Sequence, residues 1–307
     1  AMGGLLYICF YTVAFGFSVG SQILIARRNG EGNYRAVGPI MWQGSAFSLI
    51  MAVVLLGLMY FIAEPLIRLI VSSDAIFEAT CEFYVWRMWG FLFAFLNVMF
   101  RALYIGITQT KVLTMSAVVM ALVNLVFNYA LVFGRLGMPE MGVRGAALAS
   151  VISEASSLVF YLVYTYVKVD HRKYGLGRIP RFDGGMVLRI LHISCFTMVQ
   201  YFFSMGIWFV FFIALERLGQ RQLAVANIVR SVYVVLLIPA QSLSTTANTL
   251  VSNLIGAGGV DHVMSLLGKI ARMSFLIMII CAGLCALFPH AILSVYTNEA
   301  ALLEESV

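Results

Sequence analysis

Long apolar stretches separated by short polar links run through the whole chain. A helix that crosses a bilayer needs about 20 mostly apolar residues, and eight stretches reach that length. Five of them carry no formal charge: Leu5–Ala26, Ile40–Ala63, Val112–Gly134, Ile190–Leu215 and Met273–Asn298. Three are interrupted by a charge or a proline: Tyr84–Ile107, Gly145–Val167 and Leu223–Leu254. Because the longest polar link, Lys168–Arg189, is too short for a soluble domain, the pattern predicts an all-α integral membrane protein with about eight transmembrane helices.

The basic residues of the links are distributed unevenly, and this predicts the orientation of the helices. Twelve Lys and Arg residues lie in the first, third, fifth and seventh links, against five in the alternate links. Short loops rich in Lys and Arg stay in the cytoplasm, so the first helix runs from the outside inward. A chain without a cleavable signal peptide would then begin outside the cell. The sequence is therefore interpreted as a fragment that begins after a missing first helix.

Composition excludes most other classes of protein. Apolar residues make up 62% of the chain and charged residues 11%, whereas a soluble domain carries roughly a quarter charged residues. The net charge of +6 fits basic cytoplasmic loops beside a lipid bilayer, and no nucleic-acid partner is expected. The five cysteines and four histidines show no metal-ligand spacing, and no nucleotide loop or nucleophile motif is present. We therefore expect a protein that is not an enzyme and holds no cofactor.

A weak internal repeat relates the two ends of the chain. Ser18–Gln22 corresponds to Ser244–Asn248, and Gly30–Gly32 corresponds to Gly256–Gly258, in the same order and at the same offset. Six predicted helices lie within that offset, and an even number of crossings gives both copies the same orientation. A parallel repeat of this kind builds two bundles around an axis along the membrane normal, with a binding site between them.

Motifs that contain glycine and asparagine follow one another along the chain. They are Asn124–Gly134, then Gly137–Ser150, and the two glycine loops Gly30–Gly32 and Gly256–Gly258. The first two resemble the fifth helix, loop and sixth helix of the multidrug and toxin extrusion (MATE) family of secondary transporters, and the glycine loops resemble those after its second and eighth helices. The resemblance covers the chain as helices two to nine of twelve. It implies a two-lobe, parallel-repeat transporter fold in the inner (plasma) membrane.

The resemblance also implies how the chain is divided and what it does. Residues 1–170 correspond to an N-terminal lobe with helices two to six, residues 171–186 to a cytoplasmic linker, and residues 187–307 to part of a C-terminal lobe with helices seven to nine. Members of the family export small amphipathic, often cationic, organic compounds in exchange for H⁺ or Na⁺, by alternating access between the lobes. We expect the same of this chain, as a monomer.

Polar residues inside the predicted spans are the candidates for ion coupling, because polar groups are costly in a bilayer. Asn124 and Asn128 are one helical turn apart and share a face, and Ser150 lies on the next helix. Their oxygens form a candidate Na⁺ site. In the family that this chain resembles, the matching positions hold Asn and Asp on helix five and Thr on helix six, and an acid on helix one completes the set. In this chain Asn128 stands in place of the Asp, and Ser150 stands in place of the Thr. The alternative is that the two Asn side chains only hydrogen-bond neighbouring helices.

Glu154 is the one carboxylate inside a predicted span, one turn from Ser150. This position makes it a candidate proton carrier or cation attractor. The alternative is that Glu154 lies near the cytoplasmic half of its helix and either extends to the interface or pairs with a basic neighbour. Arg87, Arg101 and Arg230 fall inside other predicted spans, and they are interpreted as interfacial or structural.

Four further residues are candidates for lining the substrate cavity. Gln22 and Asn248 are related by the repeat, so we expect them at symmetric positions that face the cavity between the lobes. Many family members carry an acid in the middle of helix seven, where Ser204 stands in this chain, and Gln200 lies one turn away. We therefore expect Gln200 and Ser204 to contact substrate, and no helix-seven carboxylate to take part in coupling.

Three other functions compete with transport of drugs. The nearest is a lipid-linked oligosaccharide flippase of the same superfamily, which needs a cavity rich in Arg and Lys for pyrophosphate, whereas the predicted span interiors hold few such residues. A multi-span lipid enzyme needs clustered catalytic carboxylates or histidines at a membrane face, and the sequence shows none. A receptor or structural membrane protein is disfavoured by the parallel repeat.

Overall fold

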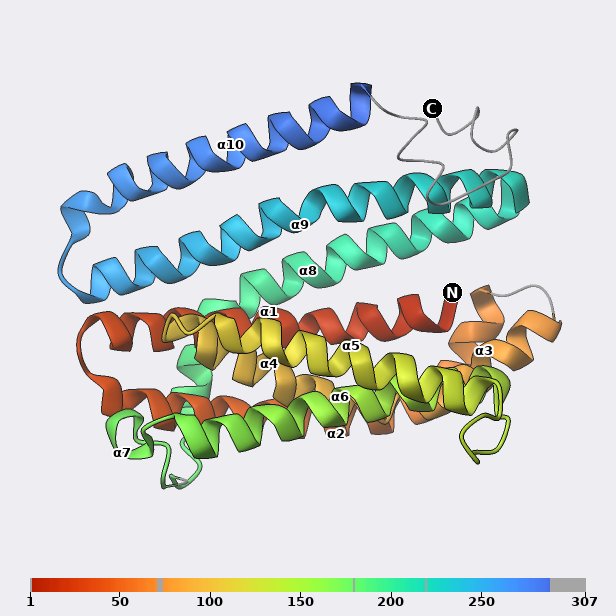
Figure 1. Cartoon of the computed structure of the whole chain (residues 1–307), viewed down its shortest axis with the longest axis horizontal. Helices are drawn as coiled ribbons and strands as arrows, with labels where there is room; N and C mark the ends of the chain where they lie inside the picture. The colour runs from red at the N-terminus through yellow and green to blue at the C-terminus, as the bar shows by residue number, and fades with distance from the viewer. Residues whose placement is uncertain (1, 71–73, 179, 219, 288–307) are drawn as a thin grey trace. The chain divides into compact units, whose positions relative to one another are not determined.

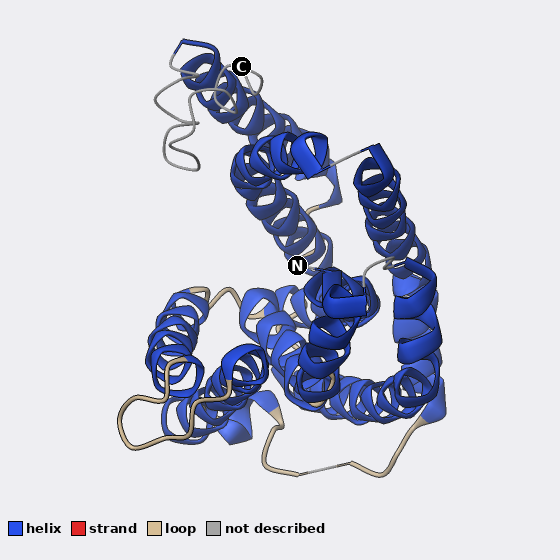
Figure 2. Cartoon of the chain, turned by 90° about the vertical axis from the view of Figure 1, so that its right-hand side faces the viewer, coloured by secondary structure: helices blue, strands red, loops and turns tan. Residues whose placement is uncertain are grey.

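The computed structural model describes residues 2–70, 74–178, 180–218 and 220–287. Every regular element in this part of the chain is a helix (Figure 1, Figure 2). The first helices are α1 (Met2–Gly30), the 3₁₀-helix η1 (Tyr34–Ala36), α2 (Val37–Ile70), α3 (Asp74–Arg87), α4 (Gly90–Gly106), α5 (Lys111–Val132) and α6 (Gly142–Lys168). They are followed by α7 (His171–Tyr174), α8 (Gly184–Leu218), α9 (Gln220–Gly256), the 3₁₀-helix η2 (Val260–His262) and α10 (Val263–Leu287).

Seven of the described helices are long and apolar enough to cross a membrane, and a bent pair of helices makes an eighth candidate span. This confirms the predicted all-α, multi-pass membrane fold. Many outward-facing side chains are apolar: on α2, for example, Val54 is 61% exposed and Phe61 is 77% exposed. Apolar surface of this extent is typical of faces that contact lipid or further helices.

The span predicted over Tyr84–Ile107 differs from the structure. The sequence predicts one helix, whereas the chain forms α3 and α4, which meet at a bend of 53°. The N–H of Met88 still bonds to the carbonyl of Tyr84 at 2.9 Å, so the break is confined to the residues between Met88 and Gly90. Glycine is the least favourable helix residue apart from proline, and it stands where α4 begins. Hydropathy missed the bend because it averages over several turns.

The last described helix begins earlier than predicted. α10 starts at Val263 rather than at Met273, and it includes Lys269 and Arg272. Hydropathy excludes charged residues from a span, but long basic side chains at the end of a helix can extend to the polar interface while the backbone remains helical. The predicted continuation of this span past residue 287 lies outside the described residues.

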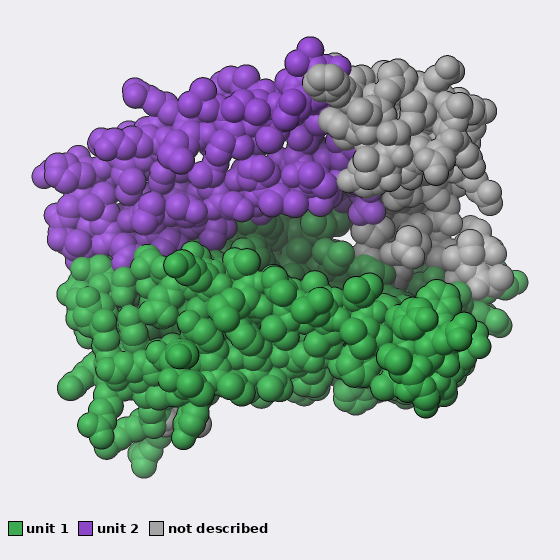
Figure 3. All heavy atoms as spheres, viewed as in Figure 1, with its two compact units in different colours: residues 1–206 green, residues 207–307 purple. Residues whose placement is uncertain are grey.

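The chain divides into two compact units, residues 1–206 and 207–307, which have different colours in Figure 3. In the first unit α4 is the central helix, because it packs against α1, α2 and α6 and twelve of its 17 residues are buried. α5 packs along α6 in the same unit, and in the second unit α9 packs along α10. The lobe boundaries expected from the sequence stay a prediction.

Two glycines allow α1 and the first part of α8 to approach each other closely. Gly16 and Gly20 lie four residues apart, a spacing that predicts close helix packing in membranes. A Cβ at Gly16 would lie 2.6 Å from the Cα of Met198, and one at Gly20 would lie 2.7 Å from the Cβ of Ser194. These distances leave no room for a side chain, so the contact requires glycine.

The segment expected to link the lobes is held against α2 by two adjacent side chains. Trp42 donates from Nε1 to the carbonyl of Leu176 at 3.1 Å. Gln43 donates from Nε2 to the carbonyl of Arg181 at 2.6 Å and accepts from the N–H of Asp183 at 3.0 Å. Backbone groups of the linker therefore find partners on α2, and this part of the linker is anchored to the first unit.

Candidate functional site

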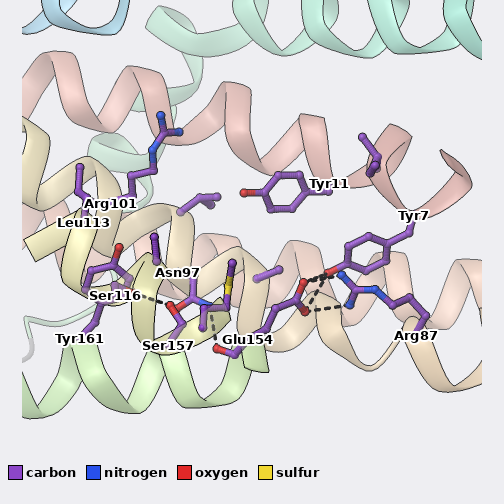
Figure 4. Close-up of a pocket in the computed structure, with 15 residues that line it drawn as sticks. Tyr7, Tyr11, Arg87, Asn97, Arg101, Leu113, Ser116, Glu154, Ser157 and Tyr161 are labelled. Atoms are coloured by element: carbon purple, nitrogen blue, oxygen red, sulfur yellow. Dashed lines mark hydrogen bonds and ion pairs between the residues drawn. The ribbon is translucent and has the colours of Figure 1, made fainter. Parts of the chain in front are cut away.

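A cavity of about 450 Å³ lies inside the first unit (Figure 4). Side chains of α1, α3, α4, α5 and α6 line it, and its polar members include Tyr7, Tyr11, Arg87, Asn97, Arg101 and Glu154. Cavities of about 300–1,000 Å³ with a few convergent polar groups are typical of small-molecule sites. This cavity combines that size with three charged side chains in a membrane-spanning unit.

Glu154 forms an ion pair with Arg87 at one end of the cavity. Arg87 donates from Nη2 to Oε1 at 2.5 Å and from Nη1 to Oε2 at 2.9 Å. The two side chains are only 12% and 14% exposed. The hydroxyl of Tyr7 lies 3.2 Å from each carboxylate oxygen and donates to them. Charge-assisted hydrogen bonds of this bidentate kind are shorter and stronger than those between neutral groups.

The surroundings of the ion pair are shaped to hold it. The guanidinium of Arg87 lies over the ring of Tyr7, with 3.6 Å between Cζ and the ring centroid. Tyr7 in turn stacks on Phe91, with 4.6 Å between centroids. A Cβ at Gly90 would collide with Nη1 of Arg87 and with Oε2 of Glu154. The glycine that begins α4 therefore leaves the space that the pair occupies.

From the sequence, pairing with a basic neighbour was one of two alternatives for Glu154, and the structure supplies Arg87 as that neighbour. A role of Glu154 in coupling stays a prediction. Sequence reasoning treated Arg87 as interfacial or structural and missed its partner. The available signal was charge: Arg87 and Glu154 are opposite charges inside two predicted spans, where each is costly alone.

Asn97 and Arg101 line the cavity from α4, one helical turn apart. Asn97 donates from Nδ2 to the carbonyl of Glu154 at 2.8 Å, while its buried Oδ1 has no hydrogen-bond partner in the structure. The guanidinium of Arg101 lies 4.7 Å from the ring centroid of Phe15. Sequence reasoning named neither as a site residue, although two polar residues four apart in an apolar helix were the signal.

The predicted ion-coupling residues on α5 lie together. Asn128 donates from Nδ2 to Oδ1 of Asn124 at 2.9 Å and to its carbonyl at 3.0 Å. Asn124 donates from Nδ2 to Oγ of Ser153 on α6 at 3.4 Å. Ser150 instead donates to the carbonyl of Ala146 on its own helix at 3.0 Å. The serine that meets the Asn pair is therefore Ser153, which lies almost one turn beyond Ser150 on α6.

The four candidates for substrate contact lie in different surroundings. Gln22 on α1 is buried, whereas Gln200 and Ser204 on α8 and Asn248 on α9 are exposed. The carbonyl of Asn248 accepts a hydrogen bond from the hydroxyl of Ser252 at 2.6 Å. Their expected position facing a cavity between the lobes stays a prediction.

Two carboxylates outside the spans have lowered pKa values. Glu31 follows α1, and a hydrogen bond from Arg28 at 2.6 Å is the main reason that its pKa lies below the usual range. Asp170 caps the N-terminus of α7, and hydrogen bonds from the backbone N–H groups of Lys173 and Arg172 lower its pKa. Hydrogen bonding to the charged form stabilises a carboxylate. Both residues lie in loops on the predicted cytoplasmic side, away from the cavity.

Comparisons with known proteins agree with one another. The MatE family model matches residues 3–130 and 195–307. A "Probable multidrug resistance protein NorM" of Thermotoga maritima is 26% identical over 94% of this chain and 62% of its own length. Another protein of the same description, from Agrobacterium fabrum, is 24% identical over 92% of this chain and 59% of its own length. The chain thus spans about three fifths of the length of these relatives.

Solved structures show the same fold. A MOP superfamily transporter from Pyrococcus furiosus, described by a "reverse polarity of binding pocket", matches with a TM-score of 0.85 and 19% identity over 99% of this chain and 68% of its own. A structure described as MATE in the straight conformation matches with a TM-score of 0.82 and 19% identity, over all of this chain and 68% of its own. At this level of identity the likeness establishes the fold.

Proposed function

The chain belongs to the MatE family, and from this premise we propose that it serves a cation-coupled antiporter that exports amphipathic, often cationic, organic compounds. The multidrug resistance proteins that it resembles support an efflux transporter. The proposal concerns the transporter as a whole, because this chain matches about three fifths of the relatives' length. The transporter works in the inner (plasma) membrane by alternating access between two lobes, as a monomer, without catalysis or a cofactor.

The single observation that carries the coupling proposal is the polar chain from Asn128 through Asn124 to Ser153, between α5 and α6. Hard cations such as Na⁺ are bound by oxygen ligands, and two amide oxygens with serine hydroxyls are ligands of that kind. We propose that Asn124, Asn128 and Ser150 bind the coupling ion, with Ser153 as the hydroxyl that positions Asn124. Glu154 serves as the proton carrier when H⁺ is the coupling ion.

The substrate path involves the polar side chains of α1, α8 and α9. Gln22 and Asn248 occupy repeat-related positions, and Gln200 and Ser204 stand one turn apart on α8. Amide and hydroxyl groups at these places hydrogen-bond a polar substrate without fixing its charge, which suits a transporter of many compounds. We propose these four residues as substrate contacts.

Drug efflux from cells that express the full-length gene tests the proposal. Ethidium efflux is measured under an imposed Na⁺ gradient and, separately, under an imposed pH gradient. We expect Asn128→Leu to lower the efflux rate at least about tenfold, a loss of roughly 1.4 kcal/mol in ion binding, because Leu offers no oxygen. Asn128→Asp should preserve or strengthen the dependence on Na⁺, because a carboxylate attracts the ion more strongly than an amide dipole.

A matched control separates this effect from a general loss of protein. Asn33 lies exposed in the loop after α1, so Asn33→Leu makes the same chemical change outside the spans and should leave efflux unchanged. Expression in the membrane is measured for each variant. If Asn128→Leu transports as the wild type does, the Asn pair only connects helices and the coupling site lies elsewhere.

A further inference from the structure

The charges that line the cavity of the first unit do not balance. Its charged residues are Arg87, Arg101 and Glu154. Arg87 and Glu154 neutralise each other in the bidentate pair. Among the described residues, Arg101 has neither an ion pair nor a hydrogen bond, and its guanidinium lies over the ring of Phe15. Within the described part of the chain, the cavity therefore carries one positive charge that has no anionic partner.

This positive charge lies away from the ion pair. In Figure 4, Arg101 and the Arg87–Glu154 pair lie at opposite ends of the cavity, and Tyr11 points into the space between them. An arginine has five N–H donors and no acceptor, so a group that enters the cavity can accept hydrogen bonds from Arg101. A guanidinium within a span is unfavourable without a partner. An anion would stabilise it most, because hydrogen bonds from Arg to an anion are assisted by charge.

We propose that this cavity binds an amphipathic organic anion, with the negative head on Arg101 and the apolar body against α5. Leu113, Ala117 and Met120 of α5 line the cavity and supply the apolar wall. The buried Oδ1 of Asn97 has no partner, and it accepts a hydrogen bond from a hydroxyl or amide next to the acid group. The volume of about 450 Å³ suits a molecule of one or two aromatic rings.

This ligand class differs from the cationic compounds that the family resemblance implies. Water-soluble organic acids and anionic lipids share the chemistry of a single negative head on an apolar body, and either source fits the cavity. The inference needs only the cavity; it rests on the proposed function solely for export of the ligand. Anion binding and drug efflux are therefore measured separately, so that each proposal can fail without the other.

Fluorescence titration of the purified full-length protein tests the proposal. The protein is placed in phosphatidylcholine nanodiscs, and the probes are anilinonaphthalene sulfonate as the anion and ethidium as the cation. We expect Arg101→Gln to raise the Kd of the anion at least about tenfold, the loss of one charge-assisted contact, and to leave ethidium unchanged. Arg101→Lys should give an intermediate Kd, because it keeps the charge but loses the planar fork.

Two further variants keep the result interpretable. Arg135→Gln neutralises an arginine in the exposed loop between α5 and α6 and should leave anion binding unchanged. Ala117→Phe fills the cavity without changing charge and should weaken anion binding, which gives a second route if Arg101→Gln does not fold. Nanodiscs that contain phosphatidylglycerol distinguish the sources: competition with the probe identifies lipid as the occupant, and no competition identifies a soluble acid.

The proposal is overturned if folded Arg101→Gln and Ala117→Phe bind the anion as tightly as the wild type. It is also overturned if Arg101→Gln weakens ethidium as much as the anion, because the site would then not select charge. Loss of anion binding with normal ethidium efflux in cells would support the anion site and leave the proposed export of cations standing.

Discussion

Replacing Glu154 by Gln should destabilise the first unit, because it leaves Arg87 charged and without an anion. The substitution keeps the size of the side chain and removes its charge. In the wild-type protein, Arg87 donates two hydrogen bonds to the carboxylate, at 2.5 and 2.9 Å. The hydroxyl of Tyr7 donates a further hydrogen bond to it at 3.2 Å. In the variant only one amide oxygen remains to accept, while the amide N–H₂ group faces a guanidinium that is itself a donor.

The magnitude follows from the burial of the pair. Removing one partner of a buried ion pair costs about 3–5 kcal/mol, because an uncompensated charge stays behind. With exposures of 12% and 14%, water screens this pair little. Gln keeps one acceptor, so we expect the lower end of the range, about 3 kcal/mol. Neutralising both residues removes the orphaned charge, so the double variant Arg87→Gln, Glu154→Gln should cost less than the sum of the singles.

Reversible unfolding in mixed detergent micelles, followed by tryptophan fluorescence, measures the free energy of unfolding for the four proteins of this cycle. Glu82→Gln is the matched control. Glu82 pairs with Arg144 at the same N···O distance of 2.5 Å, but the two side chains are 44% and 52% exposed. Surface ion pairs contribute little to stability, so the control should unfold as the wild type does.

Two results would refute the reasoning. One is a Glu154→Gln variant whose free energy of unfolding equals that of the wild type. The other is a double variant that costs the full sum of the singles, because independent residues add and a pair does not. Gly90→Ala tests the same site without changing any charge: its methyl group would collide with both members of the pair, so it should also destabilise the protein.

Three more outcomes concern the helix contacts, the linker and the orientation. Gly16→Leu places a side chain against Met198 and should reduce the folded fraction on size exclusion; a normal yield would contradict the close contact. The lowered pKa of Asp170 means that its cap stabilises α7 above the usual titration range of Asp and is lost as the pH falls through the folded-state value. The protection factors of the α7 amides, which are the intrinsic exchange rates divided by the observed rates at the same pH, should therefore fall in acid, whereas those of Asp170→Ala should be low at every pH; equal protection in both proteins would show that the cap is inert. In intact cells, an impermeant thiol reagent should label Met138→Cys and not Arg28→Cys; the reverse pattern would overturn the predicted orientation.

Much of the fold is predictable from hydropathy alone. The apolar stretches predict where the long helices lie. In lipid, backbone N–H and C=O groups have no water to bond to, and a helix satisfies them within a single segment. The bend between α3 and α4 was not predictable in this way. It depends on which neighbours pack around Gly90, and no average over a window of residues contains that information.

For the candidate site too, one part was predictable from the sequence and another was not. Asn124 and Asn128 were predicted to lie together, because a helix places residues four apart on one face, and the structure joins their side chains. The hydrogen bond from Asn124 to α6 was not predicted: it goes to Ser153, whereas Ser150 bonds to its own helix, and a role of Ser150 in ion binding stays a prediction. The rotation of one helix about its axis against another decides between two serines less than one turn apart, and sequence spacing does not contain that rotation.

The sequence by itself determined the class of protein, the long helices that cross the membrane and the local pairing along α5, because each depends on the composition of a segment or on the geometry of one helix. Only the tertiary structure decided which distant residues meet. Arg87 and Glu154 are separated by 67 positions in the chain. Their pairing, like the lack of an anionic partner for Arg101 among the described residues, follows from how α1, α3, α4, α5 and α6 pack around one cavity. Burial makes these charges interact strongly, and burial is a property of the packed helices rather than of any one segment.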